Sequence, residues 1–208
     1  MDGAAPVRDK LQAVVFTAGV AVYLWVRDRA WSPVLAGILL LAVIAVFRVR
    51  RETPASLGLA PRTFAEACRR WRWGLIGAAA ALVWAAGARS LSVASWWSGF
   101  LYFWWAAVQQ LLYQNVVAKP LCRAAASDRS ACLAAGVLFA LVHLPNPVLA
   151  PATLLWGAIS CRLFRRVPSV FGLALLQTLL SSALYWLAPA AWHHGFRVGA
   201  GYFAAGGA

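Results

Sequence analysis

The polar side chains that could carry out chemistry in this chain are few, and they lie within otherwise apolar segments. They are amides, hydroxyls and one imidazole, at Gln109, Gln110, Gln114, Asn115, His143, Asn146, Gln177, Thr178, Ser181 and Ser182. Gln110 and Gln114 are four residues apart, as are Gln177 and Ser181, so each pair shares one face of a helix. Polar groups in apolar segments usually face a partner or a cavity, because lipid solvates them poorly. We therefore expect these helix faces to line one buried polar pocket.

The second polar segment ends in Phe139-Ala-Leu-Val-His143, again a pair four residues apart. We expect His143 to lie in the same pocket as Gln110 and Gln177. All six carboxylates lie outside the apolar segments, so His143 is the group in this pocket that takes up a proton near neutral pH. A side-chain amide cannot act as a general base, but it can donate hydrogen bonds to a developing oxyanion. The alternative is that these amides and hydroxyls only hold helices together, at about 1 kcal/mol per contact.

A metal site is not expected. Zinc uses at least three protein ligands, and the pocket offers one good ligand, His143. His193 and His194 follow the last apolar segment and are expected at the membrane interface. The four cysteines form no Cys-x-x-Cys pair, so we expect free thiols that pack in the fold, without a disulfide, metal or cofactor. They are Cys68, Cys122, Cys132 and Cys161.

The composition indicates what surrounds these residues. Apolar residues make up 62% of the 208 residues, charged residues make up 12%, and the mean hydropathy is +0.70. This excess is too large to be buried inside a protein of 22.4 kDa, so it predicts that lipid surrounds much of the surface. We expect an all-α polytopic transmembrane helical bundle that forms a single integral membrane domain over residues 1–208. The membrane lipid bilayer is its first expected partner.

Seven apolar runs bounded by charged or turn residues mark the expected spans. They cover residues 11–26, 31–47, 73 to about 90, 98–117, 130–144, 148–164 and 167–187. At about 1.5 Å per residue, the longer runs cross a hydrocarbon core of about 30 Å directly. A basic connection at residues 48–72 contains the one sizeable soluble stretch, which is expected to hold a short helix over residues 63–70 along the membrane surface.

The net charge of +13 is explained by where the cations fall. In a seven-span arrangement, fifteen of the nineteen Lys and Arg residues lie on one side, while Arg27, Arg29, Arg89 and Arg197 lie on the other. Because basic loops stay in the cytoplasm, this split predicts a cytoplasmic N-terminus and an external C-terminus. The expected location is a bacterial inner (cytoplasmic) membrane, and the charge requires no nucleic-acid partner.

The order of the polar segments resembles the CAAX protease and bacteriocin-processing (CPBP, or Abi) family of intramembrane proteases. That family has Glu-Glu-x-x-x-Arg in one span, Phe-x-x-x-His in the next, and His-x-x-x-Asn or Asp two spans later. The corresponding segments here read Gln109-Gln110-Leu-Leu-Tyr-Gln114, then Phe139 to His143, then Gln177-Thr-Leu-Leu-Ser181. Of the three motifs, the Phe/His motif is intact.

The residues around these motifs are also similar to the family. They include Ser56-Leu-Gly-Leu before the third span, His143-Leu-Pro-Asn-Pro, and Val167-Pro-Ser-Val-Phe-Gly before the last motif. The resemblance covers about residues 55–187 and implies a pocket in which glutamates and histidines activate a water molecule for peptide hydrolysis.

The resemblance also implies roles for individual residues. If this chain cleaves peptides, His143 is the base, Gln109 and Gln110 hold the scissile carbonyl, and Gln177 positions substrate or water. The substrate-binding residues are expected to be Gln114, Asn146 and Ser181.

The expected function follows from these substitutions. We expect a CPBP-type peptidase-like protein that binds a hydrophobic or membrane-anchored peptide, with weak or lost proteolytic activity. Whether it acts as an intramembrane endopeptidase is left open. The alternative is a non-catalytic membrane scaffold or an immunity-type interaction protein. A small transporter is disfavoured, since the sequence has no obvious repeat and no charge embedded in a span.

Overall fold

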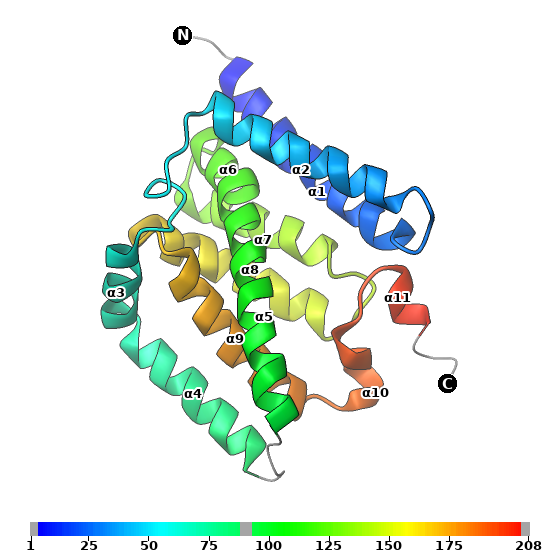
Figure 1. The fold of residues 1–208 in the computed structure, drawn as a ribbon. Coiled ribbons are helices and arrows are strands. Elements are labelled where there is room, and N and C mark those ends of the chain that lie inside the picture. Colours follow the sequence, from blue (N-terminus) through cyan, green and yellow to red (C-terminus); the bar gives the residue numbers. More distant parts are fainter. Residues whose placement is uncertain (1–3, 88–92, 205–208) are drawn as a thin grey trace. The chain divides into compact units, whose positions relative to one another are not determined.

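The computed structural model describes residues 4–87 and 93–204 (Figure 1). These residues form helices and turns, with no strand in the described ranges, which confirms the all-α prediction. The chain divides into two compact units. Unit 1 contains residues 4–52, 112–162 and 191–204, whereas unit 2 contains residues 53–87, 93–111 and 163–190.

A helix occupies each of the predicted spans. These helices are α1 (Ala4–Val26), α2 (Ser32–Val49), α4 (Arg72–Ala86), α5 (Val93–Leu112), α7 (Asp128–Leu141), α8 (Leu149–Arg166) and α9 (Val170–Leu187). The shorter elements are α3 (Pro61–Arg70), the π-helix η1 (Tyr113–Ala118), α6 (Lys119–Ala124), α10 (Ala190–His193), the 3-10 helix η2 (His194–Phe196) and α11 (Ala200–Phe203). Helix α3 confirms the short helix predicted for residues 63–70. The predicted end of the third span near Ser90, and Arg89, lie outside the described residues.

Several predicted helix ends are corrected by proline and capping residues. Helix α7 ends at Leu141 rather than at residue 144, because Pro145 lacks an N–H and disfavours helical backbone just before it. Helix α9 begins at Val170 rather than at residue 167, because Ser169 accepts a hydrogen bond from Gly172 N over 3.1 Å as its N-cap. The predicted fourth span is continued by η1, immediately before Pro120 in α6.

Three helices are long and apolar enough to cross a membrane. They are Ala5–Val26, Ser32–Val49 and Val170–Leu187, and Arg72–Ala86 is a shorter apolar helix. Large apolar side chains are also exposed on α2, α4 and α5, among them Leu41, Trp84 and Trp105. Such exposure is unfavourable in water and is expected where lipid covers the surface. The number of spans beyond three stays a prediction.

In unit 1, α1 and α2 form a helical hairpin, and α1 also packs against η1, α6, α7 and α11 (Figure 1). Helices α7 and α8 approach each other at Gly136 and Gly157. A Cβ atom on Gly157 would lie 2.8 Å from Gly136 Cα, and one on Gly136 would lie 2.5 Å from Leu154 O. Because glycine has no side chain at this crossing, the two backbones come into contact.

In unit 2, α9 packs against α4 and α3. Gly172 of α9 faces Ala67 and Trp71, where a Cβ atom would lie 2.8 Å from Ala67 Cβ. The turn before α3 is held to the start of α9 by a hydrogen bond from Val170 N to Gly58 O over 2.9 Å. Gly58 has a φ of +80°, a backbone conformation that side-chain-bearing residues rarely adopt.

Candidate functional site

Three predicted site residues meet inside unit 2. Gln110 on α5 donates from Nε2 to Gln177 Oε1 on α9 over 2.6 Å, and Gln177 donates from Nε2 to Gln109 Oε1 over 2.5 Å. Gln110 is fully buried, Gln177 is nearly so, and Gln109 is half-buried. The side-chain amide of Gln177 is therefore hydrogen-bonded at both its oxygen and its nitrogen, by two consecutive residues near the end of α5. We call Gln109, Gln110 and Gln177 the amide cluster.

Ser181 lies one turn after Gln177 on α9 and contacts α5 as well. Its Oγ accepts a hydrogen bond of 3.1 Å from the Tyr102 hydroxyl. Tyr102 was not among the predicted site residues, although it precedes Gln109 by two helical turns and thus shares its face of α5. The polar contacts between α5 and α9 extend over this second turn.

His143 lies in unit 1, just after the end of α7. Its Nδ1 is 2.7 Å from Phe139 O, and since a carbonyl can only accept, Nδ1 donates this hydrogen bond. The imidazole tautomer is therefore set by the backbone, which leaves the Nε2 lone pair to act as an acceptor or a base. The ring packs edge-on against Phe139, with centroids 4.8 Å apart. A pocket lined by His143 together with the amide cluster stays a prediction, because these residues belong to different units.

Gln114 is also fully buried in unit 1, within η1. Its Nε2 donates to Ser160 Oγ on α8 over 3.2 Å. The neighbouring Tyr113 donates from its hydroxyl to Gly157 O over 2.9 Å, and its ring packs at a tilt against Phe139, with 4.5 Å between ring centroids. These contacts join η1 to α7 and α8 at the glycine crossing.

Asn146, predicted to contact substrate, is completely buried, and its amide makes four hydrogen bonds. Its oxygen accepts from the backbone N–H groups of Val148 and Leu149, at 3.0 and 2.9 Å, and so caps α8. Its nitrogen donates to the carbonyl oxygens of His193 and Arg197, at 2.8 and 3.0 Å. Because an amide offers two donors and two favourable acceptor positions, Asn146 is saturated by the protein itself.

His193 is buried at the start of the same C-terminal turn. Gly195 N donates to its Nδ1 over 3.0 Å, which requires an unprotonated Nδ1. Burial lowers the pKa of His193, and the neighbouring His194 lowers it further. The neutral imidazole is thus the form that fits this turn.

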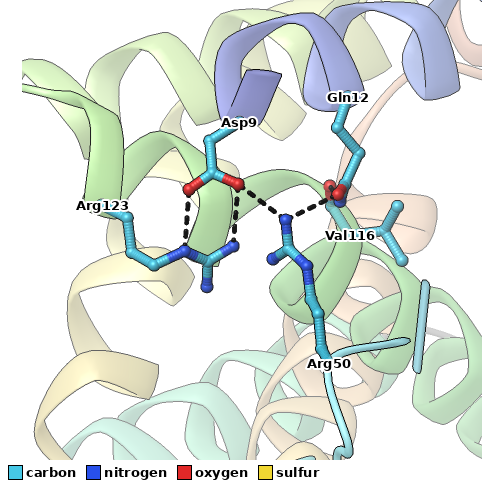
Figure 2. A network of polar contacts seen from close by, with 5 residues as sticks. All are labelled: Asp9, Gln12, Arg50, Val116 and Arg123. Carbon is cyan, nitrogen blue, oxygen red and sulfur yellow. Dashed lines mark hydrogen bonds and ion pairs between the residues drawn. The ribbon is translucent and has the colours of Figure 1, made fainter. Parts of the chain in front are cut away.

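A buried ion network in unit 1 was not predicted from the sequence (Figure 2). Asp9, placed before the first span in the prediction, lies inside α1 and inside the candidate span Ala5–Val26. Its carboxylate accepts a hydrogen bond of 2.6 Å from Arg50 Nη2, just after α2. It also accepts hydrogen bonds of 2.8 and 3.2 Å from Arg123 Nε and Nη2 on α6. The helix that holds Asp9 begins at Ala4 rather than at residue 11, and the position of Asp9 outside the spans stays a prediction. Two guanidinium groups stabilise its charge there.

Gln12, one turn after Asp9, extends this network. Its oxygen accepts from Arg50 Nη2 over 2.7 Å, and its Nε2 donates to Val116 O over 2.9 Å (Figure 2). Val116 lies four residues before Pro120, which has no N–H to donate back to that carbonyl. The proline that interrupts the regular helix therefore also leaves an acceptor for α1.

The turn that ends α2 positions a second ion pair, between Glu52 and Lys119. Glu52 N donates to Phe47 O over 2.9 Å and Arg51 N donates to Arg48 O over 3.1 Å, which is the Schellman pattern, with Arg51 at φ 50°. Glu52 then faces Lys119, at 3.4 Å between Oε2 and Nζ. Burial lowers the pKa of Lys119, while the charge and hydrogen bond of Glu52 act in the opposite direction.

All four cysteines are free thiols, but three of them converge. Cys122, Cys132 and Cys161 place their sulfur atoms within 4.8 Å of one another in unit 1. They are the one group of three or more potential metal ligands of the His, Cys, Asp and Glu types found among the described residues.

No family model matches the chain, and neither a curated protein nor a solved structure shows significant similarity to it.

Proposed function

We propose that this chain is a CPBP-type, peptidase-like membrane protein that binds a hydrophobic or membrane-anchored peptide and has weak or lost proteolytic activity. The observation that supports this most directly is the amide cluster. The residues at the first and third motif positions of the resemblance, on α5 and α9, are joined side chain to side chain.

The chemistry of the cluster supports binding more than hydrolysis. Carboxylates at Gln109 and Gln110 would supply a base, whereas amides stay neutral at all physiological pH values and cannot accept the proton of a water molecule. His143 keeps one basic nitrogen, with its tautomer set by Phe139 O. In the cleaving form of this proposal, His143 is the base and the amides hold the scissile carbonyl.

The second candidate function is a non-catalytic scaffold or immunity-type partner. It is favoured by the saturation of Asn146, whose four hydrogen bonds all join parts of unit 1. A side chain whose donors and acceptors are all occupied within the protein has none left to bind a substrate. The two candidates predict the same fold and differ in what the buried amides do.

We further propose seven spans in a bacterial inner membrane, with a cytoplasmic N-terminus and an external C-terminus. Unit 1 supports this orientation at both ends. Asp9, Arg50 and Arg123 come from three segments predicted to be cytoplasmic, and they share one ion network. About 22 Å further along α1, at 1.5 Å per residue, the predicted external end of the first span contacts the predicted external C-terminal segment, since a Cβ atom on Gly199 would lie 2.5 Å from Leu24 O.

The orientation is tested by reporter fusions. We expect alkaline phosphatase to be inactive and a fluorescent reporter to be active when fused after Arg70, Arg123 or Arg166, because these positions follow basic segments. A fusion after Trp192 should give the reverse result. A cytoplasmic reading after Trp192 would contradict the seven-span arrangement.

The function is tested by cleavage in liposomes. We expect the wild-type chain to cleave membrane-anchored peptides feebly or not at all, because positioned acid–base groups contribute about 10²- to 10⁴-fold and most are replaced by amides. The triple variant Gln109→Glu, Gln110→Glu, Gln177→His should gain cleavage that a further His143→Ala change removes. The measurement is product formation resolved by mass spectrometry.

The matched control is Ser182→Ala, a neighbouring hydroxyl on α9 outside the three motifs, which should leave cleavage unchanged. Robust wild-type cleavage that is lost in His143→Ala would show that His143 suffices without a carboxylate. Absence of both peptide binding and cleavage in the wild type and in the triple variant would favour the scaffold.

A further inference from the structure

We propose that Cys122, Cys132 and Cys161 form a binding site for monovalent copper, Cu(I). The three residues come from different helices of unit 1, α6, α7 and α8. Cys161 Sγ lies 2.9 Å from Cys132 Sγ and 3.7 Å from Cys122 Sγ. The spatial convergence of three thiols is the observation that carries the proposal.

The glycine crossing explains why the thiols meet. Cys132 lies one turn before Gly136 on α7, and Cys161 lies one turn after Gly157 on α8. Because these glycines bring the two backbones into contact, the thiols on the adjacent turn are forced together. Cys122 on α6 then completes the group, since α6 packs against α7.

The separations suit one small ion. With metal–sulfur bonds of about 2.3 Å, three thiolates around a single ion lie about 3.8–4.0 Å apart. The Cys122–Cys161 separation of 3.7 Å is close to this range. The Cys132–Cys161 pair, at 2.9 Å, is as close as an ordinary N–H···O contact although sulfur is the larger atom. To share one ion, this pair must open by about 1 Å.

The ligand set favours Cu(I) over other ions. Thiolates are soft ligands and select Cu(I), zinc or iron–sulfur clusters. A structural zinc site needs four protein ligands, whereas the described residues supply three in this group. The surroundings are apolar and include Ala135, Leu121 and Phe139, which keeps competing oxygen ligands away.

The chemistry of binding involves no change of oxidation state. Each thiol that becomes a ligand loses its S–H proton to solvent, and a sulfur–copper bond forms in its place. Binding should therefore tighten as the pH rises. In the proposed orientation the site lies at the cytoplasmic end of α7 and α8, where reducing conditions keep thiols reduced. Cys122 is half-buried, so it gives the ion a route to the two buried thiols.

The test is a Cu(I) titration of the purified full-length protein in detergent, under reductant, against a chromogenic Cu(I) chelator. We expect one Cu(I) per chain, with thiolate-to-copper absorption in the ultraviolet and a higher melting temperature on loading. Cys132→Ser, Cys161→Ser and Cys122→Ser should each weaken binding by more than about 100-fold, since even indirect contacts to a bound metal are worth about 10- to 100-fold.

The matched control is Cys68→Ser on α3, which lies outside the group and should bind Cu(I) like the wild type. Circular dichroism on each sample reports the fold, and Cys122→Ser, the least buried position, carries the test if a core variant unfolds. The proposal would be overturned if the wild type bound Cu(I) no more tightly than Cys161→Ser does. Displacement of Cu(I) by an equal concentration of Zn(II) would overturn it as well.

Discussion

We expect Gly136→Val to destabilise unit 1 by at least about 3 kcal/mol, at or above the upper end of the usual cost of overpacking a core. A Cβ atom at this position would lie 2.5 Å from Leu154 O and 2.9 Å from Ala158 N. Both obstacles are backbone atoms of α8, so they cannot rotate away as a side chain can. The two helices must separate, and the contacts of Tyr113 and Phe139 beside the crossing are then lost.

The measurement is the free energy of unfolding in detergent, followed by helicity. A second readout is the reactivity of Cys132 and Cys161 toward a maleimide, which should rise as the buried thiols become exposed. The matched control is Gly37→Ala on α2, where a Cβ atom meets nothing within 4 Å. That change should be neutral or stabilising by up to about 1 kcal/mol, since alanine favours helix over glycine. Equal stability of Gly136→Val and the wild type would show that α7 and α8 do not cross as described.

We expect Asp9→Asn to destabilise unit 1 by about 3 kcal/mol, the lower end of the range for breaking a buried ion pair. The variant leaves Arg50 and Arg123 close together without the carboxylate that holds both. The cost is at the lower end because the Arg123 side chain is 45% exposed, and water partly screens its charge. The measurement is again unfolding in detergent, at low and at high salt.

Two further variants separate this network from ordinary surface charge. Asp28→Asn removes a carboxylate of the same unit that is 75% exposed and 3.7 Å from Arg27, so it should change stability by less than about 0.5 kcal/mol. Adding Arg50→Met to Asp9→Asn should recover part of the loss, because it removes the buried cation left unpaired. If Asp9→Asn had the same free energy of unfolding as Asp28→Asn, the ion network around Asp9 would be contradicted.

The local pattern of the sequence determined where the helices lie. Apolar runs in lipid or in a core form helices because a helix satisfies its backbone hydrogen bonds within the segment. Single residues decided the helix ends, as Pro145 does after α7 and the Ser169 cap does before α9. These are local effects, which the capping and proline preferences of the sequence itself specify.

The sequence predicted part of the amide cluster. Spacing placed Gln110 and Gln177 on polar helix faces, and residue type showed that they could hydrogen-bond but not take up a proton. The choice of partner required the packing of α5 against α9, which brings Gln109 and Gln110 to opposite ends of one amide. The tautomer of His143 depended on a carbonyl one turn away, which a sequence motif does not specify.

The thiol group and the ion network were decided by tertiary structure alone. Cys132 and Cys161 are 29 residues apart, and Asp9 and Arg123 are 114 residues apart, so no spacing pattern relates them. Their distances depend on how closely two helices approach and on the rotation of each helix about its axis. Those quantities come from the summed packing of whole surfaces, such as the contact of Gly136 with Gly157. For this reason four cysteines without a paired motif predicted only free, packed thiols, whereas the fold brings three of them together.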